Sequence, residues 1–97
     1  MNSLYLKGTK KLQLENHHEI LLSYYLMEWR KKEDKKTLYG IQIEKKDGEI
    51  IETENSGYLS YSQDFVLQLI HKMMENTVTP ITMLYVIDDV ITEELCS

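Results

Sequence analysis

The hydrophobic pattern of this 97-residue chain changes its period near Ser62, and this change constrains the fold more than any other feature. Before Ser62, apolar residues alternate with polar ones, which is typical of half-buried β-strands. After Ser62, apolar residues recur every three to four positions, which is typical of amphipathic helices. Strands followed by helices in one short chain predict an α+β fold, in which an antiparallel sheet carries two C-terminal helices packed on one face.

Four strands are expected before the change of period. The segment EILLSYYLMEWR, residues 19–30, has apolar and aromatic side chains on both faces, which is typical of a central strand whose second face is partly covered. The patterns at residues 10–15 and 37–46 alternate more regularly. We therefore place the strands at residues 10–15, 19–30, 37–46 and 49–54 of a single domain that spans residues 1–97.

An Asp-Gly dipeptide marks a hairpin between the last two strands. A two-residue loop would set Ile43 opposite Glu52, whereas a three-residue loop at residues 46–48 sets Ile43 opposite Ile51. The longer loop keeps apolar residues on one face, because the register decides which side chains share a face. We expect this register, with Gly48 in the left-handed conformation of a bulged turn.

Two amphipathic helices are expected at residues 62–76 and 80–94, joined by a corner that contains the only proline of the chain. Proline fits the first turn of a helix, where its missing N–H is not needed. Either Thr79 or Thr82 caps the second helix, and Asn76 supplies the left-handed residue that ends the first. These roles explain the corner without a ligand.

The composition argues against several classes of protein. With 11 basic and 16 acidic residues the net charge is −5, so the chain lacks the basic surface that binding to nucleic acid requires. No apolar segment is long enough to span a membrane, and the N-terminus lacks the apolar core of a signal peptide. Cys96 is the only cysteine, which excludes an intrachain disulfide and fits a reducing compartment. We expect a cytoplasmic protein without a membrane or nucleic-acid partner.

Motifs for catalysis or for cofactor binding are absent from the sequence, and no catalytic residue or cofactor is predicted. The best metal candidates are Glu15, His17 and Glu19, which alternate and so share one side of an extended segment. They offer at most three ligands, with no second pair of histidines nearby. An exposed hairpin turn explains them better.

Candidate interaction residues lie in the corner and on the last helix. The corner has more polar groups than two helix ends require, and the last helix has an acidic end, which opposes the helix dipole. An exposed tyrosine beside these acids is suitable interface material. The candidates are Asn76, Thr77, Thr79, Thr82, Tyr85 and Asp88.

Three segments carry a resemblance to a known family: ILLSYYLMEW, TLYGIQIEKKDGEII and SQDFVLQLIHKMMENTVTPITMLYVIDDVI. Over residues 10–91 the chain resembles a family of small bacterial proteins, mainly clostridial, classed as a domain of unknown function. The most specific element is the Asn-Thr-Val-Thr-Pro corner at residues 76–80, followed by the Tyr-Gly-Ile-x-Ile strand. The resemblance implies a bacterial protein with no assigned activity, and it supplies no catalytic residues.

The leading hypothesis is a small non-enzymatic interaction or regulatory module, with homodimerisation as a further expectation. Its protein partner would bind a sheet edge or the Tyr85 and Asp88 face of the last helix. The alternative hypothesis is a small-molecule or metal-ion binding protein with modest enzymatic activity. A pocket with convergent polar groups would favour the alternative, and a flat apolar patch would favour the interaction module.

Overall fold

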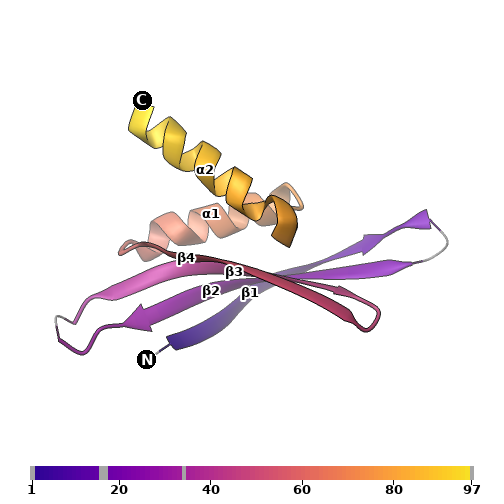
Figure 1. The fold of residues 1–97 in the computed structure, drawn as a ribbon, viewed down its shortest axis with the longest axis horizontal. Coiled ribbons are helices and arrows are strands. Elements are labelled where there is room, and N and C mark those ends of the chain that lie inside the picture. Colours follow the sequence, from indigo (N-terminus) through magenta and orange to yellow (C-terminus); the bar gives the residue numbers. More distant parts are fainter. Residues whose placement is uncertain (1, 16–17, 34, 97) are drawn as a thin grey trace.

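The computed structural model describes residues 2–15, 18–33 and 35–96, with side chains up to residue 91. The elements are β1 (Asn2–Gln13), β2 (Glu19–Arg30), β3 (Thr37–Asp47), β4 (Ile50–Ser60), α1 (Gln63–Glu75) and α2 (Pro80–Cys96). The strands form one antiparallel sheet in the order β1-β2-β3-β4, and both helices lie on the same face of it (Figure 1). The predicted α+β fold is confirmed.

The core forms where the helices cover the middle of the sheet. Leu22, Tyr24 and Leu26 alternate along β2 and are buried on the helix-facing side. The rest of this core comes from β3, the two helices and the corner between them: Ile41, Ile43, Val66, Leu69, Ile70, Met73, Val78, Met83 and Ile87. The central position predicted for residues 19–30 follows, because β2 pairs with a strand on each side.

The first strand is longer than predicted, since β1 begins at Asn2 and not at residue 10. Leu4, Tyr5 and Leu6 are consecutive apolar residues, so this half of the strand shows no alternation. A shift of register between Leu6 and Gly8 then breaks the pattern again. The pattern predicted only the half of β1 that alternates.

The last strand is also longer, because β4 continues to Ser60 beyond an irregularity that interrupts the ladder. Gly57 has φ +70 there, and the Ser56 hydroxyl accepts a hydrogen bond of 2.9 Å from the Ile41 N–H. A β-carbon on Gly40 would lie 2.1 Å from the Gly57 carbonyl oxygen, so only glycine fits. The bulge therefore lies inside a strand, where a loop was expected.

The predicted hairpin register is wrong. Asp47 pairs with Ile50 and Ile43 pairs with Glu54, which leaves a two-residue loop at residues 48–49. Gly48 does have a positive φ of 61°, as the first central residue of a type II′ turn requires. Residues 50–55 of β4 are exposed on both faces. Burial therefore gave no advantage to the predicted register, which places Ile51 opposite Ile43.

Two polar contacts hold the helical layer on the sheet. The Tyr24 hydroxyl, which is fully buried, donates a 2.8 Å hydrogen bond to the Val78 carbonyl in the corner between the helices. The Lys10 ammonium donates a 2.9 Å hydrogen bond to the Met74 carbonyl at the end of α1. A cation is favourable at this negative end of a helix.

Within the described residues, both helices fall short of the length and apolar character that a crossing of the bilayer requires.

Replacing Tyr24 with phenylalanine is expected to lower the free energy of unfolding by about 1–3 kcal/mol, because the buried Val78 carbonyl loses its donor. Urea denaturation measures this change. The matched control is Tyr61→Phe at an exposed tyrosine after β4, which should change stability by less than about 0.5 kcal/mol. Equal effects of the two substitutions would contradict an anchoring role for Tyr24.

The difference between the wild type and Tyr24→Phe is expected to shrink at alkaline pH. Burial raises the pKa of Tyr24 above its ordinary value, so the folded state binds this proton more tightly than the unfolded state does. The stabilisation is complete below about pH 10, the pKa of an unfolded tyrosine, and is lost as the pH rises through the folded pKa. Denaturation curves of both proteins between about pH 8 and about pH 11 measure the trend.

Candidate functional site

The corner between the helices begins with a Schellman motif at the end of α1. The Thr77 N–H donates to the Met74 carbonyl at 3.3 Å, and the Val78 N–H donates to the Met73 carbonyl at 2.9 Å. Thr77 has φ +53, whereas the C-cap Asn76 has φ −94. The sequence predicted Asn76 as the left-handed residue. That prediction is wrong, because Thr77, the next residue, takes this conformation.

The left-handed conformation is unfavourable at Thr77, because its β-branched side chain crowds the backbone. The two hydrogen bonds of the motif offset this cost. Val78 and Met73 are both buried in the core, at the two positions where an apolar contact frequently accompanies the motif. The Tyr24 bond to Val78 fixes the same residue from the sheet side.

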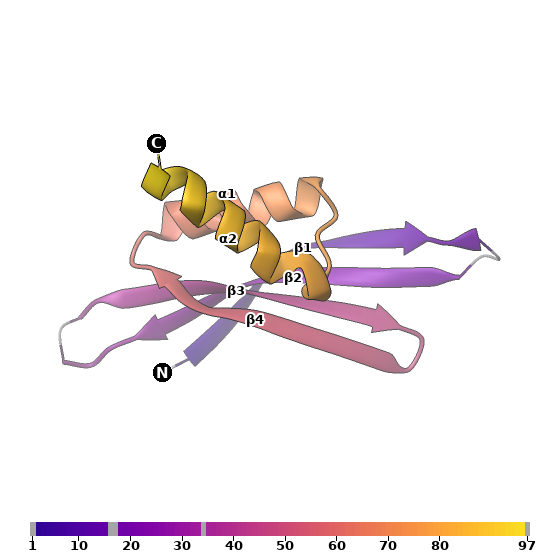
Figure 2. The same cartoon turned by 45° about the horizontal axis from the view of Figure 1, so that its top comes forward.

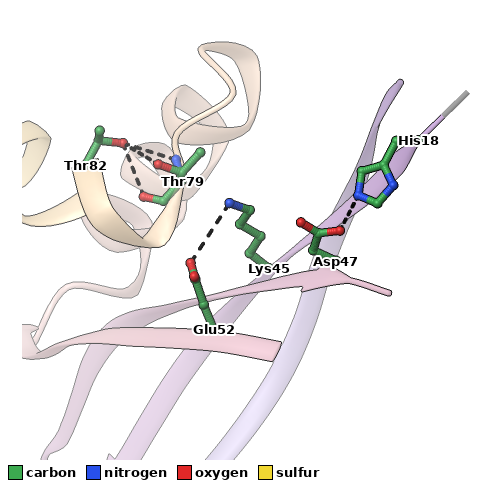
Figure 3. Close-up of polar contacts among 6 residues, drawn as sticks. All are labelled: His18, Lys45, Asp47, Glu52, Thr79 and Thr82. Atoms are coloured by element: carbon green, nitrogen blue, oxygen red, sulfur yellow. Dashed lines mark hydrogen bonds and ion pairs between the residues drawn. The ribbon is translucent and has the colours of Figure 1, made fainter. Parts of the chain in front are cut away.

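The second half of the corner is the N-terminus of α2, where Thr79 precedes Pro80 and is the N-cap. The Thr82 hydroxyl accepts a 3.2 Å hydrogen bond from the Thr79 N–H and lies 3.0 Å from the Thr79 hydroxyl (Figure 3). It also lies 3.2 Å from the Thr79 carbonyl oxygen. The bond from the Thr79 N–H to the Thr82 hydroxyl is the return half of a capping box, with threonine in the place of the usual glutamate. Both threonines thus have partners within the corner.

The predicted metal candidates do not form a site in the described residues. His17 lies outside the described residues, and Glu15 and Glu19 are exposed near the two ends of the β1–β2 connection. No group of three or more potential metal ligands occurs in the part of the chain that the structure describes. His18 instead contacts Asp47 at the end of β3 (Figure 3). Sequence reasoning missed this pair because finding it requires the β2–β3 register.

A groove of about 880 Å³ runs beside α1, where the helix passes β1. Leu67, Ile70 and Met74 supply its apolar part, and its charged and polar lining residues are Lys7, Asp64, Gln68, His71, Lys72 and Glu75. The His71 Nε2 atom lies 3.5 Å from the Glu75 Oε1 atom, but both side chains are exposed. Polar groups therefore surround the groove without converging in a buried pocket, which is not the arrangement expected for a small-molecule site.

The outward side of α2 is more unusual. Met83 and Ile87 are buried against the sheet, as an amphipathic helix requires. The opposite side nevertheless exposes Ile81, Leu84 and Tyr85, which recur at i, i+3 and i+4. Asp88 continues this stripe one turn later, and Asp89 lies beside it.

We call this surface the outer α2 face and define it by Ile81, Leu84, Tyr85 and Asp88. Neither Asp88 nor Asp89 forms an ion pair with another residue in the described ranges. The sequence predicted Tyr85 and Asp88 as interaction residues, and the structure places both on this face. Ile81 and Leu84 were missed, although their spacing from Tyr85 is visible in the sequence.

The fold and these surfaces define a small α+β protein with a helical pair on one face of an antiparallel sheet. Residues 3–93 match a family of unknown function, DUF6514, and the chain belongs to this family. No curated protein and no solved structure matches the chain. The family membership agrees with the predicted resemblance to a domain of unknown function.

Replacing Thr77 with glycine is expected to raise the free energy of unfolding by up to about 1 kcal/mol, because glycine takes the left-handed conformation without strain. Thermal and urea denaturation measure this change. The control is Thr53→Gly in exposed β4, which should lower stability by about 0.5–1 kcal/mol. Lower stability of Thr77→Gly would show that contacts of the Thr77 side chain outweigh its strain.

Replacing Thr82 with valine, which has nearly the same shape, is expected to lower stability by about 1 kcal/mol, because the Thr79 N–H loses its acceptor. The melting temperature should fall in proportion. Thr53→Val in β4 is the matched control and should be close to neutral, since β-branched residues suit strands. An unchanged melting temperature of Thr82→Val would show that the hydrogen bond from the Thr79 N–H to the Thr82 hydroxyl does not stabilise α2.

Proposed function

We propose that this protein is a small, non-enzymatic interaction module that binds a protein partner through the outer α2 face. The observation that carries the proposal is the exposure of Ile81 and Tyr85, at 71% and 72%, on one stripe of a helix whose other side is buried. Burying a side chain of this size contributes about 1.5–3 kcal/mol. A helix with apolar residues on two sides is therefore suited to packing on both of them.

The position of α2 in the fold supports this use. The helix packs on the sheet near its start and then diverges from it toward the C-terminal end (Figure 2). The outer α2 face points away from the sheet, so a partner can approach it without displacing any part of the core. A helix that binds a partner in this way presents apolar anchors at helical spacing, as Ile81, Leu84 and Tyr85 do.

The charge of α2 indicates the chemistry of the partner. Residues 80–96 contain no lysine, arginine or histidine, and Asp88 lies within the apolar stripe. A second copy of this helix would bring more acidic groups and no compensating charge. A segment that combines apolar side chains with lysine or arginine complements the surface, and electrostatic complementarity also speeds association.

The same proposal includes a bacterial, cytoplasmic setting and a regulatory role exerted through the bound partner. The single cysteine supports this setting, since a chain that uses no disulfide has no need of an oxidising compartment.

Selection from a random-peptide display library tests the proposal directly. Peptides selected on the wild-type protein are expected to combine lysine or arginine with apolar residues at helical spacing. Their affinity for a Tyr85→Ser and Asp88→Lys double variant should fall by about tenfold or more, because a buried tyrosine and a reversed charge both weaken the contact. Fluorescence anisotropy with labelled peptides measures the affinities.

The matched control is Tyr61→Ser, which removes an exposed tyrosine outside α2 and should leave the affinity unchanged. Circular dichroism confirms that each variant is folded. Selected peptides without basic residues, or peptides that bind the double variant as tightly as the wild type, would contradict the proposal.

A further inference from the structure

The N-terminal half of β1 is an edge strand with unusual exposure. Leu4, Tyr5 and Leu6 are 50%, 44% and 56% exposed, and because they are consecutive they present apolar groups on both faces of the sheet. No charged residue occurs between Asn2 and Leu6. An edge of this kind offers unpaired backbone N–H and carbonyl groups to another strand.

The other edge positions are protected in the ways that natural sheets use. Glu52 and Glu54 line the exposed half of β4, and the bulge at Gly57 interrupts its second half. Along β1, lysines occupy positions 7, 10 and 11, after the apolar segment. Charges and bulges at edges prevent pairing between sheets. The segment at residues 3–6 contains neither a charged residue nor a bulge.

We infer that this segment pairs antiparallel with the same segment of a second copy, with Tyr5 of one chain facing Tyr5 of the other across a two-fold axis. The inference concerns β1 and is independent of the outer α2 face. Two such strands are related by an axis perpendicular to the sheet, so each residue faces one that points to the same side. The two position numbers of every facing pair must therefore have an even sum.

Among the possible registers, the one centred on Tyr5 matches the side chains best. It sets Leu4 of each chain opposite Leu6 of the other, on the face away from the helices, where the two form an apolar cross-strand pair. A register centred on Leu4 would oppose Leu6 to Asn2, and one centred on Leu6 would oppose Leu4 to Gly8. Both alternatives lose the two leucine pairs.

Charge is compatible with this register. Lys7 of each chain lies opposite Ser3 of the other, so the two lysines are four residues apart along the ladder. At about 3.3 Å per residue this separation is about 13 Å. That distance exceeds the Debye length of about 8 Å at physiological ionic strength, so their repulsion is screened.

Apolar surface next to the pairing segment adds to the interface. A groove of about 310 Å³ adjoins Leu4 and is lined by Met27, Gln42 and Tyr58 together with the first residues of β1. The Tyr58 hydroxyl donates to the Asn2 side chain at 3.1 Å, and its ring lies 5.8 Å from the ring of Trp29. Leu6 of the second copy would face Leu4 at the rim of this groove.

Light scattering over a hundredfold range of protein concentration tests the inference. The wild type is expected to change from monomer to dimer as concentration rises, and Leu6→Lys is expected to stay monomeric with an unchanged circular dichroism spectrum. The matched control is Ile51→Lys, which places the same charge at a residue 57% exposed on the opposite edge and should dimerise as the wild type does.

Three outcomes would overturn the inference: a wild type that stays monomeric throughout, a Leu6→Lys protein that dimerises as the wild type does, or dimerisation lost equally in Ile51→Lys. Particles larger than a dimer that grow with concentration would also overturn it. They would indicate head-to-tail pairing of the basic end of β1 with the acidic edge of β4.

A cysteine scan in a Cys96→Ser background tests the register. Facing residues of antiparallel strands have Cα atoms about 4.5–5.5 Å apart, a distance that a disulfide spans. Tyr5→Cys should therefore form a covalent dimer when copper phenanthroline and oxygen act as the oxidant. Ser3→Cys lies on the same face but would be more than about 13 Å from its equivalent, and should remain monomeric on a non-reducing gel. Faster cross-linking of Ser3→Cys than of Tyr5→Cys would refute the register.

Discussion

The hydrogen bond from Tyr24 to the Val78 carbonyl is the contact on which the helical layer depends. It joins the middle of the central strand to the corner between the helices, and it does so inside the core, where no water can replace either partner. Val78 is also the residue that closes the Schellman motif of α1. This bond therefore ties the end of α1 and the start of α2 to the central strand of the sheet.

This arrangement covers only part of the sheet. The helices pack over the middle of one face, while the hairpin of β3 and β4 extends beyond them (Figure 1) and residues 50–55 are exposed on both sides. The opposite face has no second layer in the described chain, and the outer edges of β1 and β4 pair with no further strand within it. The core is small for the area of the sheet, which leaves the apolar surfaces at the start of β1 and on the outside of α2 available for contacts with other chains.

Sequence reasoning succeeded where a buried face imposed a period on the chain. The β2 pattern identified the central strand, and the stripes of α1 and α2 gave both helices within two residues of their observed ends. Sequence reasoning failed where no buried face imposed a period on the chain. Ile50 and Ile51 are exposed, so their hydrophobicity was no guide to the hairpin register, and the turn conformation at Gly48 decided it. The bulges near Lys7 and Gly57 interrupted the alternation of β1 and β4, so the pattern predicted only the last part of β1 and the first part of β4.

Residue type predicted part of the outer α2 face. Tyrosine and aspartate are suited to an interface, and Tyr85 and Asp88 were predicted for that reason. Residue type did not predict the left-handed residue at the end of α1. Asparagine favours this conformation more than threonine does, yet the hydrogen bonds from the Thr77 and Val78 N–H groups place it at Thr77 and not at Asn76.

The two proposed contact surfaces are compatible in one assembly. An axis perpendicular to the sheet places the helices of both copies on the same side, and α2 packs mainly on β4 and β3, away from the paired β1 edges. A dimer would thus present two outer α2 faces on one side of a continuous eight-stranded sheet. A partner with two basic segments would then bind both faces, and its second contact would be favoured by a high effective concentration if the linker between the segments spans the dimer. Dimerisation through β1 would in this way strengthen binding through α2 without any contact between the two surfaces.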